Sequence, residues 1–473
     1  MNFKPSRKPD YLILSDEEYL RKKNNKEFSS KILAKKTLRS RFSELETTNT
    51  VLEAFANIKS FSFKNYGDYV CSVLKTNLVS DENGRVSDIL LTVPPYYDPN
   101  SPNILVNPMD KRHLISLIRL MFNADNNRHF TMLCHSYQLE EVENWFDEIG
   151  IENSRFSLNI SVFDYSIWAQ DAYVALKDEN NNTIICEGVL FPRADDHSIA
   201  DDISAQTSNS TYQSYLFFQG GNILEIGDYV FIGKDYIIEN LGRAHLETEK
   251  KVLDAFENLL GKPVISVGRD ELIEEGHRRY LGGGYFQPIF HIDMYITPTG
   301  KKNHLDKDII LVGSPKLGRL AIGEVSKPND FDIYFDEVET QLSNYFEVRR
   351  IPILPSYIHH LIRNDKGDIV REVKRYYYLS FNNAIVENYE EESNVYLPSF
   401  SQDVQWYLNN PDVIEYQGEI NQRVSLDNAA KKVWEDLEFK VHQMDGLEDL
   451  AIGWGSVHCI TKTLSRSSAE HLV

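Results

Sequence analysis

Four polar side chains that are suited to covalent chemistry are spread along this chain of 473 residues. Cys459 follows the glycine-rich run Gly453-Trp-Gly455 and is a candidate nucleophile, because a thiolate attacks electrophilic carbon. His291 can serve as general acid and base at neutral pH. Asp293 lies two residues further on, so in a strand its carboxylate would share a face with the imidazole. Asp171 completes the set.

Each of these residues also has a structural explanation. Cys is among the most buried residue types for packing reasons alone. Asp171 follows Trp168-Ala-Gln170 and fits a turn or the end of a strand. His458 would point to the opposite face of a strand from its neighbour Cys459, which favours a structural role for this histidine. The combination of a nucleophile, a base and carboxylates in one chain favours a catalytic role over a purely structural one.

The elements that must position these residues alternate between strand-like and helical stretches, which predicts an α/β fold. The sequence predicts helices at 111–122, 138–149, 247–260, 335–346 and 429–438. It predicts strand pairs at 173–186, 222–232, 294–313 and 378–398, and a last pair on either side of Cys459. The strand–turn–strand–helix unit recurs about five times, which indicates an internal repeat. Each chemical residue stands at the start of a strand pair.

The composition and charge of the chain argue against some classes of function. With 42% hydrophobic and 26% charged residues, the chain is typical of a globular enzyme. The formal net charge of −21 argues against a nucleic-acid partner, which usually meets a basic face, and is compatible with steering of a cationic substrate. The sequence predicts neither a signal peptide nor a membrane span, and a cytoplasmic location is expected.

The four cysteines are far apart in the sequence, which argues against a zinc site or a disulfide framework. Cys71 and Cys134 lie in apolar runs and are predicted to be buried, inert thiols. The acidic stretch 195–202 lacks the spacing of a calcium loop and is expected on a surface loop. The stretch 227–235 lacks the spacing of a phosphate-binding loop.

Two domains are predicted. Residues 1–85 form an N-terminal extension, partly helical and basic, with charge at Lys22-Lys23, Lys35-Lys36 and Arg39-Ser-Arg41. A solvated helical arm is about twice as favoured as a binding arm, since charge runs mostly mark solvated surface. Residues 86–473 form the catalytic domain. Within it, Gly282–Gly284 predicts a flexible loop that could act as a lid.

Taken together, the motifs resemble the guanidine-modifying, or pentein, superfamily, and agmatine deiminases and bacterial peptidylarginine deiminases in particular. The motifs are Trp168-x-Gln-Asp171, Gly220-Gly-Asn222, His291-x-Asp293 and Gly455-x-Val-His-Cys459. The likeness runs from about residue 88 to 466 and includes 379–383 and 395–398. It implies a five-bladed, pseudo-fivefold α/β propeller with the site at its centre.

The resemblance also implies roles for individual residues. Cys459 would be the nucleophile, His291 the general acid and base, and Asp171 and Asp293 the carboxylates that bind a guanidinium. The implied substrate-binding residues are Trp168, Gln219, Gly220, Gly221, Asn222, Asn383 and Gly455. Carboxylates suit this cation because a planar guanidinium presents its donors in a fork. The chemistry requires neither a metal nor an organic cofactor.

The expected activity is that of a deiminase, which hydrolyses agmatine, a related small guanidino compound or arginine in a peptide or protein. An amidinotransferase, in which an amine intercepts the same covalent intermediate, is the first alternative, and a protein that binds a guanidino ligand without turnover is the second. No membrane partner is expected, and the sequence leaves homo-oligomer formation open.

Two departures from the family pattern concern the substrate. Agmatine deiminases usually have Arg where this chain has Gln170, and the family commonly has an acidic residue where this chain has Gln219. A free amino acid would need a cation for its carboxylate, and the candidates are Arg193, Arg243 and Arg278. No calcium dependence is carried over, because no matching ligand motif is visible.

Overall fold

The computed structural model describes residues 76–94, 111–189, 191, 193, 195–243, 246–274, 284–324, 330–363, 368–389, 392–401, 413–415 and 420–467. The predicted N-terminal extension lies outside these residues except for its end, 76–85. Cys71, Arg278 and two glycines of the predicted lid, Gly282 and Gly283, also lie outside them. The remaining predictions can be compared with the fold.

The described strands form five sheets that share one pairing order. In each sheet a first strand runs antiparallel to a second, and the second runs parallel to a third. Three of the sheets contain β5 (Tyr173–Lys177), β6 (Thr183–Glu187) and β7 (Ser210–Gln213); β8 (Ile223–Ile226), β9 (Tyr229–Gly233) and β10 (Val264–Val267); and β11 (Ile296–Lys302), β12 (Asp308–Ser314) and β13 (Glu347–Arg363). The other two contain β15 (Ile385–Tyr389), β16 (Glu392–Pro398) and β18 (Lys440–Met444); and β19 (Lys462–Ser467), β2 (Arg85–Thr92) and β3 (His129–His135). The predicted internal repeat is therefore present in the strand pairing.

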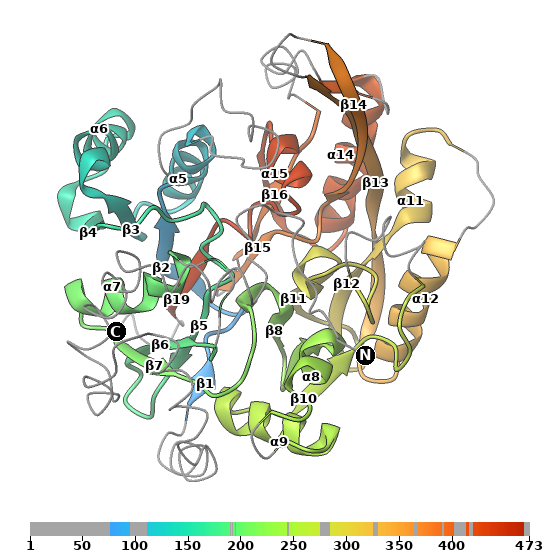
Figure 1. The fold of residues 1–473 in the computed structure, drawn as a ribbon, viewed down its shortest axis with the longest axis horizontal. Helices are drawn as coiled ribbons and strands as arrows, with labels where there is room; N and C mark the ends of the chain where they lie inside the picture. Colours follow the sequence, from blue (N-terminus) through green and yellow to red (C-terminus); the bar gives the residue numbers. More distant parts are fainter. Residues whose placement is uncertain are drawn as a thin grey trace.

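Four further strands extend these sheets. β1 (Asn77–Leu78) pairs with β5, and β4 (Phe156–Ser161) pairs with β3. β14 (Ile369–Ser380) and β17 (Val413–Glu415) both pair with β13. The β13–β14 hairpin reaches well beyond the other sheets at the top of Figure 1.

Helices cover the outer sides of the sheets (Figure 1). α5 (Arg112–Ala124), α6 (Leu139–Ile149), α9 (Glu249–Leu260), α12 (Asp330–Leu342) and α14 (Ile420–Glu435) correspond to the predicted helices, and the shorter α7 (Ile199–Gln206), α8 (Lys234–Asn240), α11 (Pro315–Ala321) and α15 (Glu448–Ile452) were not predicted. In α9, Val252, Phe256 and Leu259 are buried, as expected of one apolar stripe at helical spacing. The helix begins where the side chain of Thr248 accepts a hydrogen bond from the backbone of Lys251, and it ends at the left-handed Gly261.

The first strand of each sheet lies toward the middle of the molecule in Figure 1. β11 contacts β8 and β15, and β19 contacts β5. All four residues of β8 and the first four of β5 are buried, which explains why these strands read as continuous apolar runs. The result is a mixed α/β fold whose inner strands all start near one another.

The prediction of a strand pair on either side of Cys459 is wrong. α15 and a run of turns precede this cysteine, and the strand after it, β19, pairs with β2 from the other end of the described chain. The glycines and small residues of 453–456 form turns instead of a strand. The C-terminal sheet is thus completed by strands from both ends of the fold.

Residues 80–84 tie together the outer ends of three hairpins. Glu82 accepts hydrogen bonds from the backbone of Gly227 at 2.8 Å and of Gly300 at 2.8 Å, and its carbonyl accepts one from Asn388 at 3.1 Å. The neighbouring Asp81 accepts one from the backbone of Glu225 at 2.7 Å. This segment, which lies inside the predicted extension, is therefore packed against the sheets.

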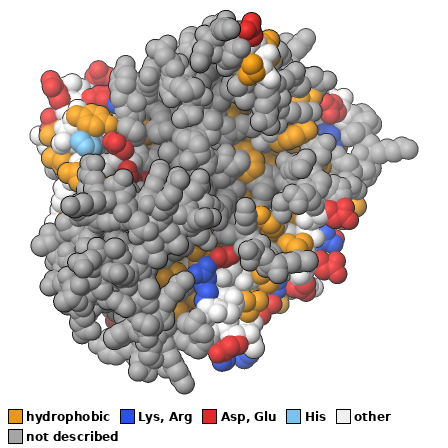
Figure 2. Space-filling model, in the orientation of Figure 1, with side chains coloured by type: hydrophobic (Ala, Val, Ile, Leu, Met, Phe, Trp, Pro, Cys, Tyr) orange, Lys and Arg blue, Asp and Glu red, His pale blue; other side chains and the backbone are white. Residues whose placement is uncertain are grey.

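None of the described helices is both long and apolar enough to cross a membrane. On the face shown in Figure 2, the described acidic and basic side chains are interspersed along the lower right edge.

Candidate active site

The predicted chemical residues stand just before the inner strands. Asp171 precedes β5, η5 (Gly220–Asn222) precedes β8, and η6 (Ile292–Met294) precedes β11. Asn383 precedes β15 and Cys459 precedes β19. Because the inner strands lie side by side with their starts at one end, these five segments converge.

Cys459 is fully buried and is bound to Asn383 at two points. Its backbone N–H donates to Oδ1 of Asn383 at 3.1 Å, and Nδ2 of the same amide donates to the cysteine Sγ at 3.1 Å. The thiol lies 3.5 Å from Oδ2 of Asp293. The amide therefore positions the sulfur and can stabilise a thiolate, because it offers a donor to the charge.

The turn that leads to Cys459 carries backbone strain. Trp454 has a φ of 64°, in the left-handed region that costs a bulky residue about 1–2 kcal/mol. Its ring is held by the hydrogen bond from Nε1 to the carbonyl of Tyr376 at 2.8 Å and by Phe290, whose ring centroid is 5.6 Å away. At Gly455 a Cβ would lie 2.2 Å from the ring of Trp168, so only glycine fits between this indole and Cys459.

His291 is buried, and its two ring nitrogens face different partners. Nε2 lies 3.0 Å from Oε1 of Gln219 and 3.0 Å from the hydroxyl of Tyr236. Because the Gln219 oxygen only accepts, Nε2 carries a hydrogen, and Nδ1 is the nitrogen that gains and loses a proton. Nδ1 faces Oδ1 of Asp171 at 3.7 Å. This geometry suits a general acid and base that works through Nδ1.

Gly221 lies between the three polar groups of the site. A Cβ at this position would be 2.6 Å from Nδ1 of His291, 3.2 Å from Oδ2 of Asp293 and 3.4 Å from Oδ1 of Asp171. A side chain at this position would therefore collide with the imidazole, so glycine allows the imidazole and both carboxylates to approach one another here. This observation places three of the four predicted catalytic residues around one small volume, and the 3.5 Å contact between Asp293 and Cys459 adds the fourth.

Asp171 is paired with a buried arginine. Nη1 of Arg193 lies 2.9 Å from Oδ2 of Asp171, and its Nε donates to Asp196 at 2.6 Å. Burial alone would lower the pKa of Arg193, but the two carboxylates outweigh it and raise this pKa. Nη2 also donates to the carbonyl of Trp168 at 3.2 Å. The guanidinium suggested as a carboxylate-binding group is therefore engaged in holding Asp171.

The acidic stretch 195–202 is not the surface loop that the sequence predicted. Asp196 is 2% exposed and Asp202 is 1% exposed. Asp196 accepts from the backbone of Ser166 at 2.8 Å as well as from Arg193. The carboxylates are buried because they serve as acceptors for the segment that leads to Asp171.

His458 also differs from its prediction. Its Nδ1 lies 2.9 Å from Oδ2 of Asp293, and its Nε2 lies 3.8 Å from Oδ1 of Asp81. The alternation argument fails because residues 457–460 form turns and not a strand, so neighbouring side chains are not sent to opposite faces. Burial alone would lower the pKa of His458, but the hydrogen bonds to Asp293 and Asp81 raise it to about 9.

The other predicted residues differ in how directly they contact the site. Asn222 accepts hydrogen bonds from the backbone of Ile292 at 3.0 Å and from Gln287 at 2.9 Å, so it holds the segment between His291 and Asp293. At Gly220 a Cβ would lie 2.1 Å from the carbonyl of Gln170, which shows a close backbone packing. Arg243 pairs with Glu239. Cys134, predicted to be buried, is so, and burial raises its pKa to about 11.

Three residues of the site environment were not found from the sequence. Tyr236, in α8, contacts His291, and Asp81 contacts His458. Lys462 begins β19 and is 6% exposed; burial lowers its pKa to about 8 although Asp81, Asp171 and Asp293 act in the opposite direction. Residues such as Asp81 carry no motif, because their role depends on a contact with a distant part of the chain.

Comparison with solved structures places this geometry in a known fold. No protein-family model matches the sequence, and no curated protein is similar to it. The structure matches agmatine deiminase of Enterococcus faecalis with a TM-score of 0.54 and 12% identity, over 83% of this chain and 96% of the other. The C. jejuni enzyme of the same name matches with a TM-score of 0.50 and 10% identity, over the same shares. The chain has the pentein fold.

A third structure agrees with this assignment. It is a structural-genomics target provisionally named an agmatine deiminase, with a TM-score of 0.56 and 15% identity, over 83% of this chain and 96% of the other. At these identities the comparison establishes the pentein fold, and the argument for activity depends on the site.

Proposed function

We propose that this pentein-fold chain is a deiminase that hydrolyses a guanidinium to a ureido product and ammonia through a covalent intermediate on Cys459. The observation that carries the proposal is the convergence of His291, Asp171 and Asp293 on Gly221, with Cys459 beside Asp293. A nucleophile, a proton carrier and two carboxylates around one buried volume suit a planar cation. The five sheets with one pairing order support a five-bladed arrangement around this centre.

The two carboxylates select the substrate by charge. Arg193 balances the charge of Asp171 and His458 that of Asp293, while Oδ1 of Asp293 is buried and accepts no hydrogen bond from a described residue. A buried acceptor in this state favours a ligand that donates. A guanidinium supplies donors in a planar fork, and its charge strengthens the hydrogen bonds that it donates to a carboxylate beyond those of a neutral amide.

The reaction proceeds in two steps. The Cys459 thiolate attacks the guanidinium carbon, and the carbon–nitrogen bond to the leaving group breaks as Nδ1 of His291 donates a proton, so that ammonia departs and an S-alkylthiouronium remains. Water then attacks this carbon and His291 accepts one proton from the water. The carbon–sulfur bond breaks, and the second proton of the water passes to solvent, where it converts the released ammonia to ammonium. The second step returns the thiolate and forms the ureido product. Asn383 is placed to stabilise the sulfur charge in both steps.

Both candidate arginines that the structure describes are engaged by other groups, which favours a substrate without a carboxylate. Arg193 is bound to Asp171, Asp196 and a backbone carbonyl, and Arg243 is paired with Glu239. Agmatine, which has no carboxylate, fits this arrangement, and it is the substrate in the names of the E. faecalis and C. jejuni structures. We therefore place agmatine-like compounds before free arginine and peptidylarginine.

The test is to incubate the protein with agmatine, arginine and an arginine-containing peptide and to measure ammonia and ureido product together. We expect both products, in equal amounts and fastest with agmatine. Cys459→Ala should release no ammonia while it still folds and binds agmatine. Transfer of the amidino group to an added amine without ammonia would establish the amidinotransferase alternative. Binding of agmatine with neither product would establish a binding protein.

A further inference from the structure

The two carboxylates of the site are held in the same way: Oδ2 of each is bound by one cationic side chain. Oδ2 of Asp171 accepts from Arg193 at 2.9 Å. Oδ2 of Asp293 is bound by His458 at 2.9 Å and by Asn383 at 3.0 Å. His458 thus occupies for Asp293 the place that Arg193 occupies for Asp171, although the imidazole is positively charged only when it is protonated.

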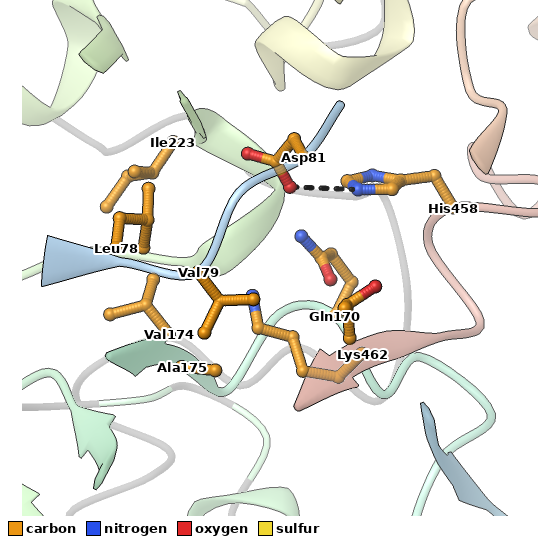
Figure 3. A pocket seen from close by; sticks show the side chains of 10 residues that line it. Leu78, Val79, Asp81, Gln170, Val174, Ala175, Ile223, His458 and Lys462 are labelled. Carbon is orange, nitrogen blue, oxygen red and sulfur yellow. Dashed lines mark ion pairs between the residues drawn. The ribbon is translucent and has the colours of Figure 1, made fainter. Parts of the chain in front are cut away.

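A second carboxylate keeps His458 in that charged form. Nε2 of the imidazole lies 3.8 Å from Oδ1 of Asp81. Asp81 is itself fixed, because its Oδ2 accepts from the backbone of Glu225 at 2.7 Å. Figure 3 shows Asp81 and His458 facing each other, joined by the dashed line of their ion pair, among the residues that line a small pocket.

The charges that face His458 come from three segments. Asp81 lies before β2, Asp293 lies in η6, and Lys462 lies at the start of β19 in the same pocket (Figure 3). The ammonium of Lys462 lies over the ring of Tyr173, 5.9 Å from its centroid. Its ammonium opposes protonation of His458, whereas Asp81 and Asp293 favour it, and the two carboxylates are the direct contacts. Cys459, the next residue in the chain, completes the surroundings.

We propose that His458 is a positioning residue that is clamped as an imidazolium between Asp81 and Asp293, and that this clamp orients the carboxylate of Asp293 for the guanidinium of the substrate. The inference rests on the proposed function for the identity of that cation. It makes residues 80–84 part of the site, since Asp81 is linked to the substrate-binding carboxylate of Asp293 through the imidazole of His458. The same segment ties the hairpin ends together through Glu82.

A purely structural His458 would produce a different result. Loss of a buried ion pair lowers stability wherever the pair lies. Loss of a clamp on Asp293 also weakens substrate binding at unchanged fold, and it changes the pH at which binding fails. The experiment therefore has to measure stability, binding and pH dependence in the same variants.

The variants are His458→Asn, Asp81→Asn and the matched control His442→Asn. Asparagine keeps a donor near the position of Nδ1 but removes the charge and the contact with Asp81. His442 is half-buried and bonds to Asn394 at 2.9 Å in another sheet, so its replacement tests the loss of a histidine away from the site. Each variant is made in the full chain, with and without Cys459→Ala.

We expect His458→Asn and Asp81→Asn to raise KM for agmatine about 10-fold or more, because a fixed charged acceptor is lost, with a smaller effect on kcat. Asp81→Asn should also move the alkaline limb of kcat/KM to lower pH, because one of the two anions that hold the proton on His458 is gone. His442→Asn should match the unmodified protein in KM, kcat and pH profile.

Binding of agmatine to the Cys459→Ala forms, measured by calorimetry, separates this proposal from the proposed function. If the unmodified protein shows no turnover but His458→Asn weakens agmatine binding, the clamp stands and the deiminase proposal fails. If turnover is present and both clamp variants keep the parental KM, dissociation constant and pH profile, the clamp is overturned. If agmatine binds to none of the forms, both proposals are overturned.

Discussion

Both polar atoms of the Asn383 side-chain amide bind Cys459. Oδ1 accepts the hydrogen bond of the cysteine backbone, and Nδ2 donates to the sulfur, each at 3.1 Å. The same Nδ2 lies 3.0 Å from Oδ2 of Asp293. A single amide therefore fixes the distance between the nucleophile and one carboxylate, and a change of its charge should affect the sulfur before it affects the fold.

We predict that Asn383→Asp lowers kcat for agmatine by about 100-fold, because a donor to the thiolate is replaced by a negative charge next to it. Alkylation of Cys459 by iodoacetamide at pH 7 should slow as well, since the thiolate form is disfavoured. The control is Asn394→Asp, at a half-buried amide that contacts His442 away from the site. Unchanged alkylation of the Asn383→Asp protein would contradict the proposed contact.

Gly221 and Gly220 are predicted to respond differently to the same methyl group. In Gly221→Ala the new Cβ meets the ring of His291 at 2.6 Å, so the ring must move, and kcat/KM should fall by about 100-fold with little change in the melting temperature. In Gly220→Ala the Cβ meets the carbonyl oxygens of Gln170 at 2.1 Å and Tyr173 at 2.6 Å, which cannot move freely.

Gly220→Ala should therefore destabilise the protein, by about 1–3 kcal/mol in chemical denaturation, because overpacking displaces backbone. Thermal melts and steady-state kinetics on the two variants provide the comparison. Full activity in Gly221→Ala would show that the substrate does not bind at this glycine.

The sequence predicted the inner strands and their leading residues, because buried strands appear as apolar runs and polar residues at their starts stand out. It could not predict that His458 contacts Asp293. The argument that His458 points away from Cys459 assumed a strand at 457–460, whereas these residues fold into turns. The role of Asp81 could not be predicted for another reason. It lies far from His458 in the sequence, and the pairing of β19 with β2 brings the two ends of the described chain together.

Asp171→Asn is expected to weaken capture of the guanidinium and to leave the fold in place. Arg193 keeps its hydrogen bond to Asp196 at 2.6 Å, so the buried arginine is not left without a carboxylate. We predict a rise in KM for agmatine of about 10- to 100-fold, the range expected for the loss of a charge-assisted hydrogen bond. Kinetics of ammonia release would measure it, with Asp436→Asn, at an exposed helical ion pair, as the control. An unchanged KM would mean that Asp171 does not contact the substrate.

His458 and Lys462 should make stability depend on pH in opposite directions. The pKa of His458 is raised from 6.5 to about 9 on folding, so its stabilising contribution is complete below pH 6.5 and is lost as the pH rises through about 9. The pKa of Lys462 is lowered from 10.5 to about 8, so burial of the ammonium costs stability below pH 8, and this cost disappears as the pH rises toward 10.5. Each effect is on the order of 3 kcal/mol.

We therefore predict a minimum in the free energy of unfolding between about pH 8 and 9, measured by urea denaturation from pH 6 to 10.5. Lys462→Met should remove the rise on the alkaline side and stabilise the protein at pH 7, because an apolar side chain of similar length replaces a buried cation. His458→Asn should remove the fall between pH 6.5 and 9. A Lys462→Met protein that is no more stable than its parent at pH 7 would show that this ammonium is compensated in the folded chain.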